Sequence, residues 1–291
     1  MQLDDQRESD QIDDRRGSGG GGGGMLGRGR LGIGGIIVVF AISYFTGISP
    51  STLMGLLGDG GSAPVEETGP AHAPPANDVT AHFVARILGS TEDIWAQEFT
   101  KLGKTYEKPT LTLFSGTTQT ACGQGQAAMG PFYCPVDRRV YLDLDFFHQL
   151  ESRFGGGGDF AEAYVISHEV GHHVQNLLGI SDKVHSARAH ASEAQGNALS
   201  VKLELQADCL AGMWGHQADV MKNQLEPGEV EQALRAAAAI GDDALQKQAR
   251  GVVMPESFTH GSSEQRMRWF NAGFESGDIN QCNTFRKGVS L

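Results

Sequence analysis

The sequence has little positive charge for its length. Its 23 lysine and arginine residues are outnumbered by 35 aspartate and glutamate residues, which gives a formal net charge of −12. Nucleic acids and anionic lipid surfaces select proteins that present clustered lysine and arginine. We therefore expect no nucleic acid among the partners of this protein.

Charge of either sign is missing between Arg30 and Asp59. Within this stretch, residues 31–48 are apolar enough to form a helix that spans about 30 Å of hydrocarbon. Residues 31–57 are therefore predicted to be a single transmembrane anchor region. Several arginines precede it, and no lysine or arginine follows before Arg86. This asymmetry predicts a cytoplasmic amino end and an extracytoplasmic remainder of the chain.

The segments on either side of the anchor lack the apolar residues of a core. Residues 1–30 are charged and then glycine-rich, which predicts a disordered cytoplasmic tail. Residues 58–77 contain several prolines and predict an extended linker. Two alternatives to an anchor are a cleaved signal peptide, which the long hydrophilic start disfavours, and a buried helix of the folded domain.

The sequence contains only four cysteines and no C-x-x-C pair, which excludes a zinc site built from cysteines. Outside the cytoplasm, an even number of cysteines predicts two disulfides. We favour Cys122 with Cys134, which closes a short glycine-containing loop and leaves Cys209 for Cys282. The other pairings and four free thiols are the alternatives.

Residues 78–291 carry the apolar patterns of a folded domain. Helical spacing predicts two short helices before residue 102, longer helices near 159–178, 192–221 and 228–248, and a last helix from Ser262. Alternating apolar residues predict strands near 111–113 and 140–146. The expected fold class is α+β and predominantly helical, with a small β-sheet. The segment 141–147 fits either an edge strand that pairs with a substrate backbone or a core strand.

The helix near residues 159–178 contains the run His168-Glu169-Val170-Gly171-His172. A spacing of four places both imidazoles on one helix face, where they can share a metal ion. Zinc accepts such nitrogen ligands, and a catalytic Zn²⁺ site needs a third protein ligand and a water. Glu169, on the same turn, is the predicted general base that takes a proton from that water. Two solvent-facing histidines on a surface helix are the alternative.

A third histidine ligand is missing from the positions that a continuous zinc motif would use, because these are Gln175 and Leu178. A carboxylate from a second helix is the other solution, and the helix near 192–221 offers two acidic residues one turn apart. We assign Glu204 to the metal and Asp208 to the remaining N–H of a ligand histidine, His168. Solvated surface carboxylates are the alternative.

Two further side chains are assigned structural roles. His173 projects away from the ligand face of its helix, so we expect it in the core or behind the metal ligands. Arg266, in the last predicted helix, is expected to form a structural ion pair.

The metal motif belongs to an ordered set of segments that runs through most of the chain: 122–147, 167–173, 204–212, 240–243 and 258–263. This set resembles a family of bacterial neutral zinc metallopeptidases, whose fold and site are similar to those of the gluzincins. The resemblance extends to the basic, glycine-rich start and the single anchor. The resemblance implies Zn²⁺ binding and hydrolysis of peptide bonds in a protein or peptide substrate, and it implies little about which substrate. Together with the predicted anchor, it places the protein in the bacterial inner (cytoplasmic) membrane.

The resemblance also places His260 just before the last predicted helix, where its imidazole can hydrogen-bond the oxyanion formed during hydrolysis. The expected function is that of a single-pass, membrane-anchored zinc metallopeptidase with its catalytic domain outside the cytoplasm. The alternative is a catalytically silent zinc protein that binds or scaffolds partners in the cell envelope. Glu169 favours the enzyme, because a scaffold needs no general base beside its metal.

Overall fold

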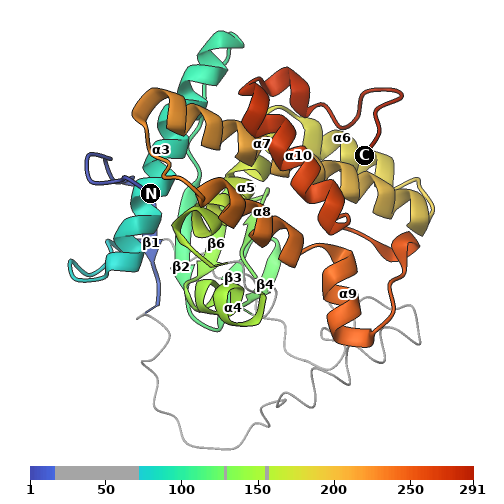
Figure 1. The fold of residues 1–291 in the computed structure, drawn as a ribbon, viewed down its shortest axis with the longest axis horizontal. Coiled ribbons are helices and arrows are strands. Elements are labelled where there is room, and N and C mark those ends of the chain that lie inside the picture. The colour runs from blue at the N-terminus through green and yellow to red at the C-terminus, as the bar shows by residue number, and fades with distance from the viewer. Residues whose placement is uncertain (17–71, 128–129, 155–156) are drawn as a thin grey trace, which may run out of the picture. The chain divides into compact units, whose positions relative to one another are not determined.

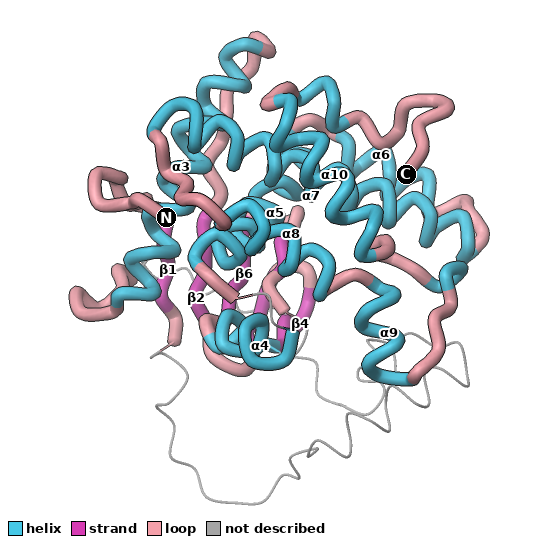
Figure 2. Tube along the Cα trace, viewed as in Figure 1, coloured by secondary structure: helices cyan, strands magenta, loops and turns pink. Residues whose placement is uncertain are grey.

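The computed structural model describes residues 1–16, 72–127, 130–154 and 157–291 (Figures 1 and 2). The predicted anchor, residues 31–57, and most of the predicted linker lie outside the described residues. Within the described ranges, no helix is both long enough and apolar enough to cross a membrane.

The helices follow the apolar periodicity of the sequence. In the described part of the chain they are α3 (Val79–Lys101), α4 (Asp145–Phe154), α5 (Asp159–Leu177), α6 (Ile180–Arg188), α7 (Glu193–Lys222), α8 (Glu229–Ala239), α9 (Asp242–Arg250) and α10 (Ser263–Ser276), together with the short 3₁₀ turns η2 (Pro255–Ser257) and η3 (Ile279–Cys282). Figure 2 shows the strands gathered in one region, away from α6 and α10. The predominantly helical α+β prediction is confirmed.

Side-chain caps fix where several helices begin. Asp78 accepts the backbone N–H of Ala81 at 2.9 Å and caps α3. Serines at the starts of α7 and α10 form capping boxes with glutamines three residues later. However, α3 continues without a break through Ser90, whose buried hydroxyl accepts the indole N–H of Trp214 at 3.3 Å. The prediction of two short helices is wrong, because this serine makes a core hydrogen bond instead of a cap.

The larger sheet has four strands in the order β1-β2-β6-β5. The strands are β1 (Ile12–Asp14), β2 (Thr110–Phe114), β6 (Arg139–Asp143) and β5 (Phe132–Cys134). The first three are parallel, and β5 runs antiparallel to β6 at the edge. Strand β6 therefore lies inside the sheet, so the core alternative is the correct one for this strand. A separate hairpin is formed by β3 (Thr117–Thr120) and β4 (Gly123–Gln126).

Residues 1–16 belong to the same folded unit as residues 72–291. Strand β1 pairs with β2 in register, and Ile12 and Asp13 are buried. The prediction of a disordered tail is therefore wrong for these residues. This pairing also requires β1 and β2 to lie on the same side of any membrane, which disagrees with a tail and a domain on opposite sides.

The helices α7 and α10 lie side by side in Figure 1 and approach each other through glycine. A Cβ atom added to Gly273 of α10 would lie 1.9 Å from the carbonyl oxygen of Cys209, and one added to Gly212 of α7 would lie 2.0 Å from that of Phe270. Only glycine permits this separation, because any side chain would meet backbone atoms. The same region is joined covalently by a disulfide between Cys209 and Cys282.

The second disulfide joins Cys122 at the β3–β4 turn to Cys134 in β5. The Cα atoms are 5.8 Å apart here and 5.3 Å apart in the Cys209–Cys282 bridge, which are ordinary distances for such bonds. The predicted pairing is confirmed.

Candidate metal centre

The candidate metal centre lies between α5 and α7. The two helices can approach closely because Gly171 of α5 faces Ala207 of α7. A Cβ atom at position 171 would lie 3.1 to 3.4 Å from three atoms of Ala207. The short contact brings the histidine-bearing face of α5 next to the acidic face of α7.

Three predicted ligands meet in this space. The candidate ligand atoms of His168, His172 and Glu204 all lie within 4.8 Å of one another. The carboxylate of Glu204 is 3.2 Å from Nε2 of His168 and 3.5 Å from Nε2 of His172. Two ligand atoms about 2.0 to 2.1 Å from a tetrahedral zinc are themselves about 3.3 Å apart. The donor set and its spacing therefore fit a zinc ion.

Asp208 orients the ring of His168 through Nδ1, the ring nitrogen that does not face Glu204. Its Oδ1 is 2.8 Å from Nδ1 of His168 and accepts the hydroxyl of Tyr164 at 2.6 Å, while Arg266 donates to both carboxylate oxygens at 2.9 Å. Burial disfavours the carboxylate, but the positive charge of Arg266 and the contact with His168 outweigh it and lower the pKa of Asp208. The ionised acceptor directs Nδ1–H of His168 toward itself and leaves Nε2 facing Glu204.

Gln175 holds the second histidine in the same way. Its amide NH₂ donates to the carbonyl oxygen of Leu203 at 2.7 Å, so its oxygen faces Nδ1 of His172 at 2.9 Å. Neither this role nor that of Tyr164 was predicted. The available signals were the three-residue spacing from His172 to Gln175 and the four-residue spacing from Tyr164 to His168, which place each pair on one helix face.

Glu169 lies beside the ligands with only 7% of its surface exposed. No other described side chain donates a hydrogen bond to its carboxylate, so its oxygens are available to a bound water. Burial raises the pKa of Glu169, and the neighbouring His172 and His168 act in the opposite direction. A carboxylate of raised basicity is suited to accept and return a proton.

His260 is oriented by Asp242, the first residue of α9. Their side chains are 3.2 Å apart, and the same carboxylate accepts the backbone N–H groups of Thr259, His260 and Gly261 at 2.7 to 3.0 Å. The hydrogen bond to Asp242 raises the pKa of His260 despite its partial desolvation, and the charge of Glu204 adds to this effect. Asp242 was not predicted as a functional residue, although it belongs to segment 240–243, which is part of the family resemblance.

His173 and Arg266 have the predicted structural roles. His173 is fully buried, its Nε2 donates to the carbonyl oxygen of Glu107 at 2.6 Å, and its Nδ1 lies 2.9 Å from the hydroxyl of Tyr133 in β5. Burial lowers the pKa of His173 to about 4. Arg266 forms the buried ion pair with Asp208.

Two histidines four residues apart, a glutamate between them and a carboxylate from a later helix that faces both imidazoles form an arrangement typical of zinc metallopeptidases. Residues 1–285 match the family described as "Putative neutral zinc metallopeptidase", and the chain belongs to this family.

The relatives cover different shares of the chain. The "Uncharacterized protein YpfJ" of Escherichia coli (strain K12) is 48% identical over 293 residues, which cover 99% of this chain and 100% of the relative. The "Uncharacterized protein Rv2575" of Mycobacterium tuberculosis (strain ATCC 25618 / H37Rv) is 48% identical over 191 residues, which cover 62% of this chain and 63% of the relative. No solved structure gives a significant match.

Proposed function

We propose that this protein is a zinc-dependent endopeptidase in which Glu169 is the general base. The observation that supports this most directly is the position of Glu204, whose carboxylate faces Nε2 of both His168 and His172 at 3.2 and 3.5 Å. A third ligand from a second helix completes a three-ligand set and leaves one position for water.

His168, His172 and Glu204 would hold the ion, and Asp208 and Gln175 keep the two imidazoles in the required orientation. Bound zinc would supply Lewis-acid polarisation of a peptide carbonyl and a lowered pKa for its water. Glu169 would accept a proton from the attacking water and return it to the leaving amine.

His260 is proposed to stabilise the oxyanion. Its ring is half exposed, with 52% of the side chain accessible, and Asp242 fixes its orientation through Nδ1. The raised pKa of His260 favours the protonated ring, whose Nε2–H is then left to donate a hydrogen bond to the developing negative charge.

We further propose that the folded unit, including residues 1–16, functions outside the cytoplasm. Two disulfides with ordinary geometry support this location, because such bonds persist in oxidising compartments. The test is thiol labelling of the denatured protein taken directly from cells. Unlabelled cysteines are expected, and four labelled cysteines would overturn the proposed location.

The test of the mechanism is Glu169→Gln, measured by elemental analysis and by cleavage of a peptide library. The variant should retain zinc and lose activity by a factor of about 10² to 10⁴, the usual contribution of a general base. Glu193→Gln, at an exposed position of α7, is the matched control and should retain both.

The rival function is a zinc-containing scaffold without catalytic activity. It predicts that the zinc-loaded parent cleaves none of the library, whereas the proposed mechanism predicts cleavage that depends on Glu169. A Glu169→Gln variant that cleaves as fast as the parent would disprove the assigned role of Glu169.

A further inference from the structure

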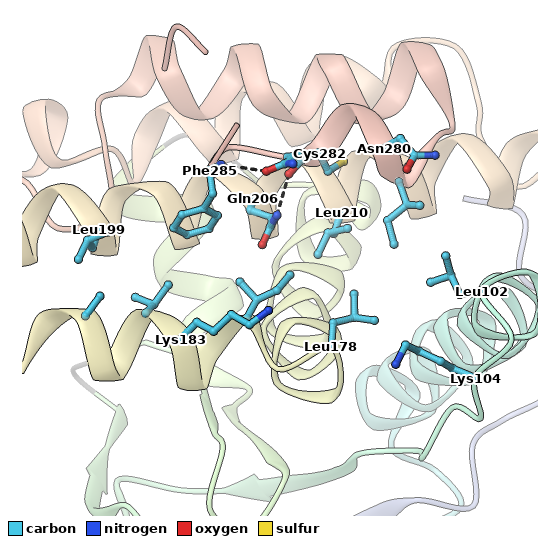
Figure 3. A pocket seen from close by; sticks show the side chains of 15 residues that line it. Leu102, Lys104, Leu178, Lys183, Leu199, Gln206, Leu210, Asn280, Cys282 and Phe285 are labelled. Atoms are coloured by element: carbon cyan, nitrogen blue, oxygen red, sulfur yellow. Dashed lines mark hydrogen bonds between the residues drawn. The ribbon is translucent and has the colours of Figure 1, made fainter. Parts of the chain in front are cut away.

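A cavity of about 600 Å³ lies away from the candidate metal ligands. Its walls come from the end of α3, from α6, from one side of α7 and from the segment that follows α10 (Figure 3). None of the three candidate ligands, nor Glu169, lines it. A volume of this size is within the range of about 300 to 1,000 Å³ that is usual for small-molecule sites.

The walls of the cavity are mainly apolar. The aliphatic and aromatic residues that line it are Leu102, Leu178, Ile180, Val184, Ala187, Leu199, Leu210, Ile279 and Phe285. The only charged residues among the fifteen that line it are Lys104 and Lys183. An apolar cavity with charge of one sign selects a ligand that has both an apolar part and the opposite charge.

The two lysines are free to bind a ligand. Neither amine forms an ion pair with any described residue, and both side chains are exposed. Figure 3 shows the amino groups of Lys104 and Lys183 directed from two sides toward the space around Leu178. The net charge of −12 repels anions from the protein as a whole, so an anion would be attracted to this cavity only by the two nearby lysines.

We propose that this cavity binds the carboxylate of a fatty acid. The alkyl chain lies against the leucine, isoleucine and valine side chains, and the carboxylate lies between the amines of Lys104 and Lys183. Burial of the alkyl chain supplies most of the affinity, and the two amines supply selectivity for a negative head group.

The proposal is tested by calorimetric titration of the full chain with two amphiphiles of equal chain length below their micelle concentrations. These are decanoate and decyltrimethylammonium, which differ in the sign of the head group. Decanoate should bind about tenfold more tightly, because two partly exposed ion pairs together contribute on the order of a tenfold change. Lys104→Met combined with Lys183→Met should abolish this preference and retain binding of the chain.

Two further variants locate the binding. Ala187→Trp places a large side chain in the cavity from an exposed position of α6, and should weaken binding of both amphiphiles about tenfold or more. Lys247→Met, at an exposed position of α9 outside the cavity, should leave both affinities unchanged. Equal affinities of the parent for the two amphiphiles, or a preference that survives both lysine substitutions, would overturn the proposal. The titration requires neither zinc nor cleavage, so its result is independent of the proposed peptidase activity.

Discussion

Asp208 accepts hydrogen bonds from three side chains while it is fully buried. Asp208→Asn should reduce zinc affinity about 10- to 100-fold, because loss of the acceptor frees the ring of His168 to adopt the wrong orientation. It should also destabilise the fold, since Arg266 would keep a buried charge without its partner. Zinc affinity is measured by competition with a chelator.

The control for this prediction is Asp243→Asn. Asp243 accepts the backbone N–H and the hydroxyl of Ser263 at 2.7 and 2.8 Å, so its loss weakens the start of α10 without a contact to His168. The zinc affinity of the Asp243→Asn variant should be close to that of the parent. If Asp208→Asn also bound zinc with parental affinity, Asp208 would not be a positioning residue.

Glu162, near the start of α5, makes stability depend on pH. Burial and then the charges of Asp159 and Glu151 raise its pKa from 4.5 to about 7. The folded protein therefore holds this proton more tightly than the unfolded chain, and stability is lost as pH rises from about 4.5 through 7. Glu162→Gln should stabilise the fold at pH 8 by about 1 to 2 kcal/mol, a value reduced for partial exposure.

This effect should be absent at pH 4.5, where the carboxyl group is largely protonated in the folded protein. The measurement is urea unfolding at the two pH values, with Glu193→Gln as the exposed control. A gain for Glu162→Gln that is equal at both pH values would rule out the shifted carboxyl as its cause.

At the residue scale, the sequence predicts the parts of the site that follow a helical spacing. His168, Glu169 and His172 share one turn of α5, and Glu204 and Asp208 share one turn of α7. The roles of Gln175 and Asp242 were not predicted. The orientation of the Gln175 amide depends on the carbonyl oxygen of Leu203 in α7, and Asp242 accepts backbone N–H groups of residues 259–261, so both require segments separated in sequence to pack together.

At the scale of elements, the contact between α7 and α10 leaves no room for an added side chain at its glycines. Gly273→Ala should destabilise the fold by about 3 kcal/mol, because its methyl group would meet the carbonyl oxygen of Cys209 in the neighbouring helix. Gly196→Ala, also in a helix, is the matched control: its methyl group would lie 3.7 Å from its nearest neighbour, the guanidinium of Arg188. The control should gain up to about 1 kcal/mol from helix propensity.

Both variants are compared by urea unfolding with the disulfides intact. Equal effects of the two substitutions would mean that α7 and α10 separate at little cost. The outcome also bears on the site, because α7 carries Glu204 and α10 carries Arg266.

At the element scale, the two helices that carry the metal ligands, α5 and α7, were predicted close to their bounds. The single helix predicted at 228–248 is wrong, because the chain breaks there into α8 and α9, and the short strand pairings were not predicted. Strand β1 has only three residues, two of them acidic, and nothing in their local pattern indicates burial. Its place in the sheet depends on partners far along the chain, since Arg139 and Arg15 hydrogen-bond the carboxylate of Asp13. Such a strand is determined by tertiary contacts rather than by its own propensity.

For the whole molecule, the described residues on either side of segment 17–71 are joined to each other. The N–H of Asp14 donates to the carbonyl oxygen of His72 at 2.8 Å, and Arg16 forms an ion pair with Asp78 at 2.8 Å. Replacement of residues 17–71 by a short glycine linker should therefore leave zinc binding unchanged and shift the melting temperature by only a few degrees, equivalent to about 1 kcal/mol or less.

Removal of residues 1–71 is the matched comparison, because it deletes β1 as well. This truncation should lower the melting temperature much further, since it exposes the edge of β2 and leaves Arg139 without Asp13. The measurement is thermal unfolding of both proteins with zinc bound. Equal melting temperatures would show that β1 contributes nothing to stability.

The junction of Asp14 with His72 also has a mechanical consequence. A force applied to the intervening segment enters and leaves the folded unit at neighbouring points. The first interactions to bear that load are the Asp14–His72 hydrogen bond, the Arg16–Asp78 ion pair and the pairing of β1 with β2. Tension on this segment would separate β1 from β2 before it disturbed α5 and α7, the helices that carry the metal ligands.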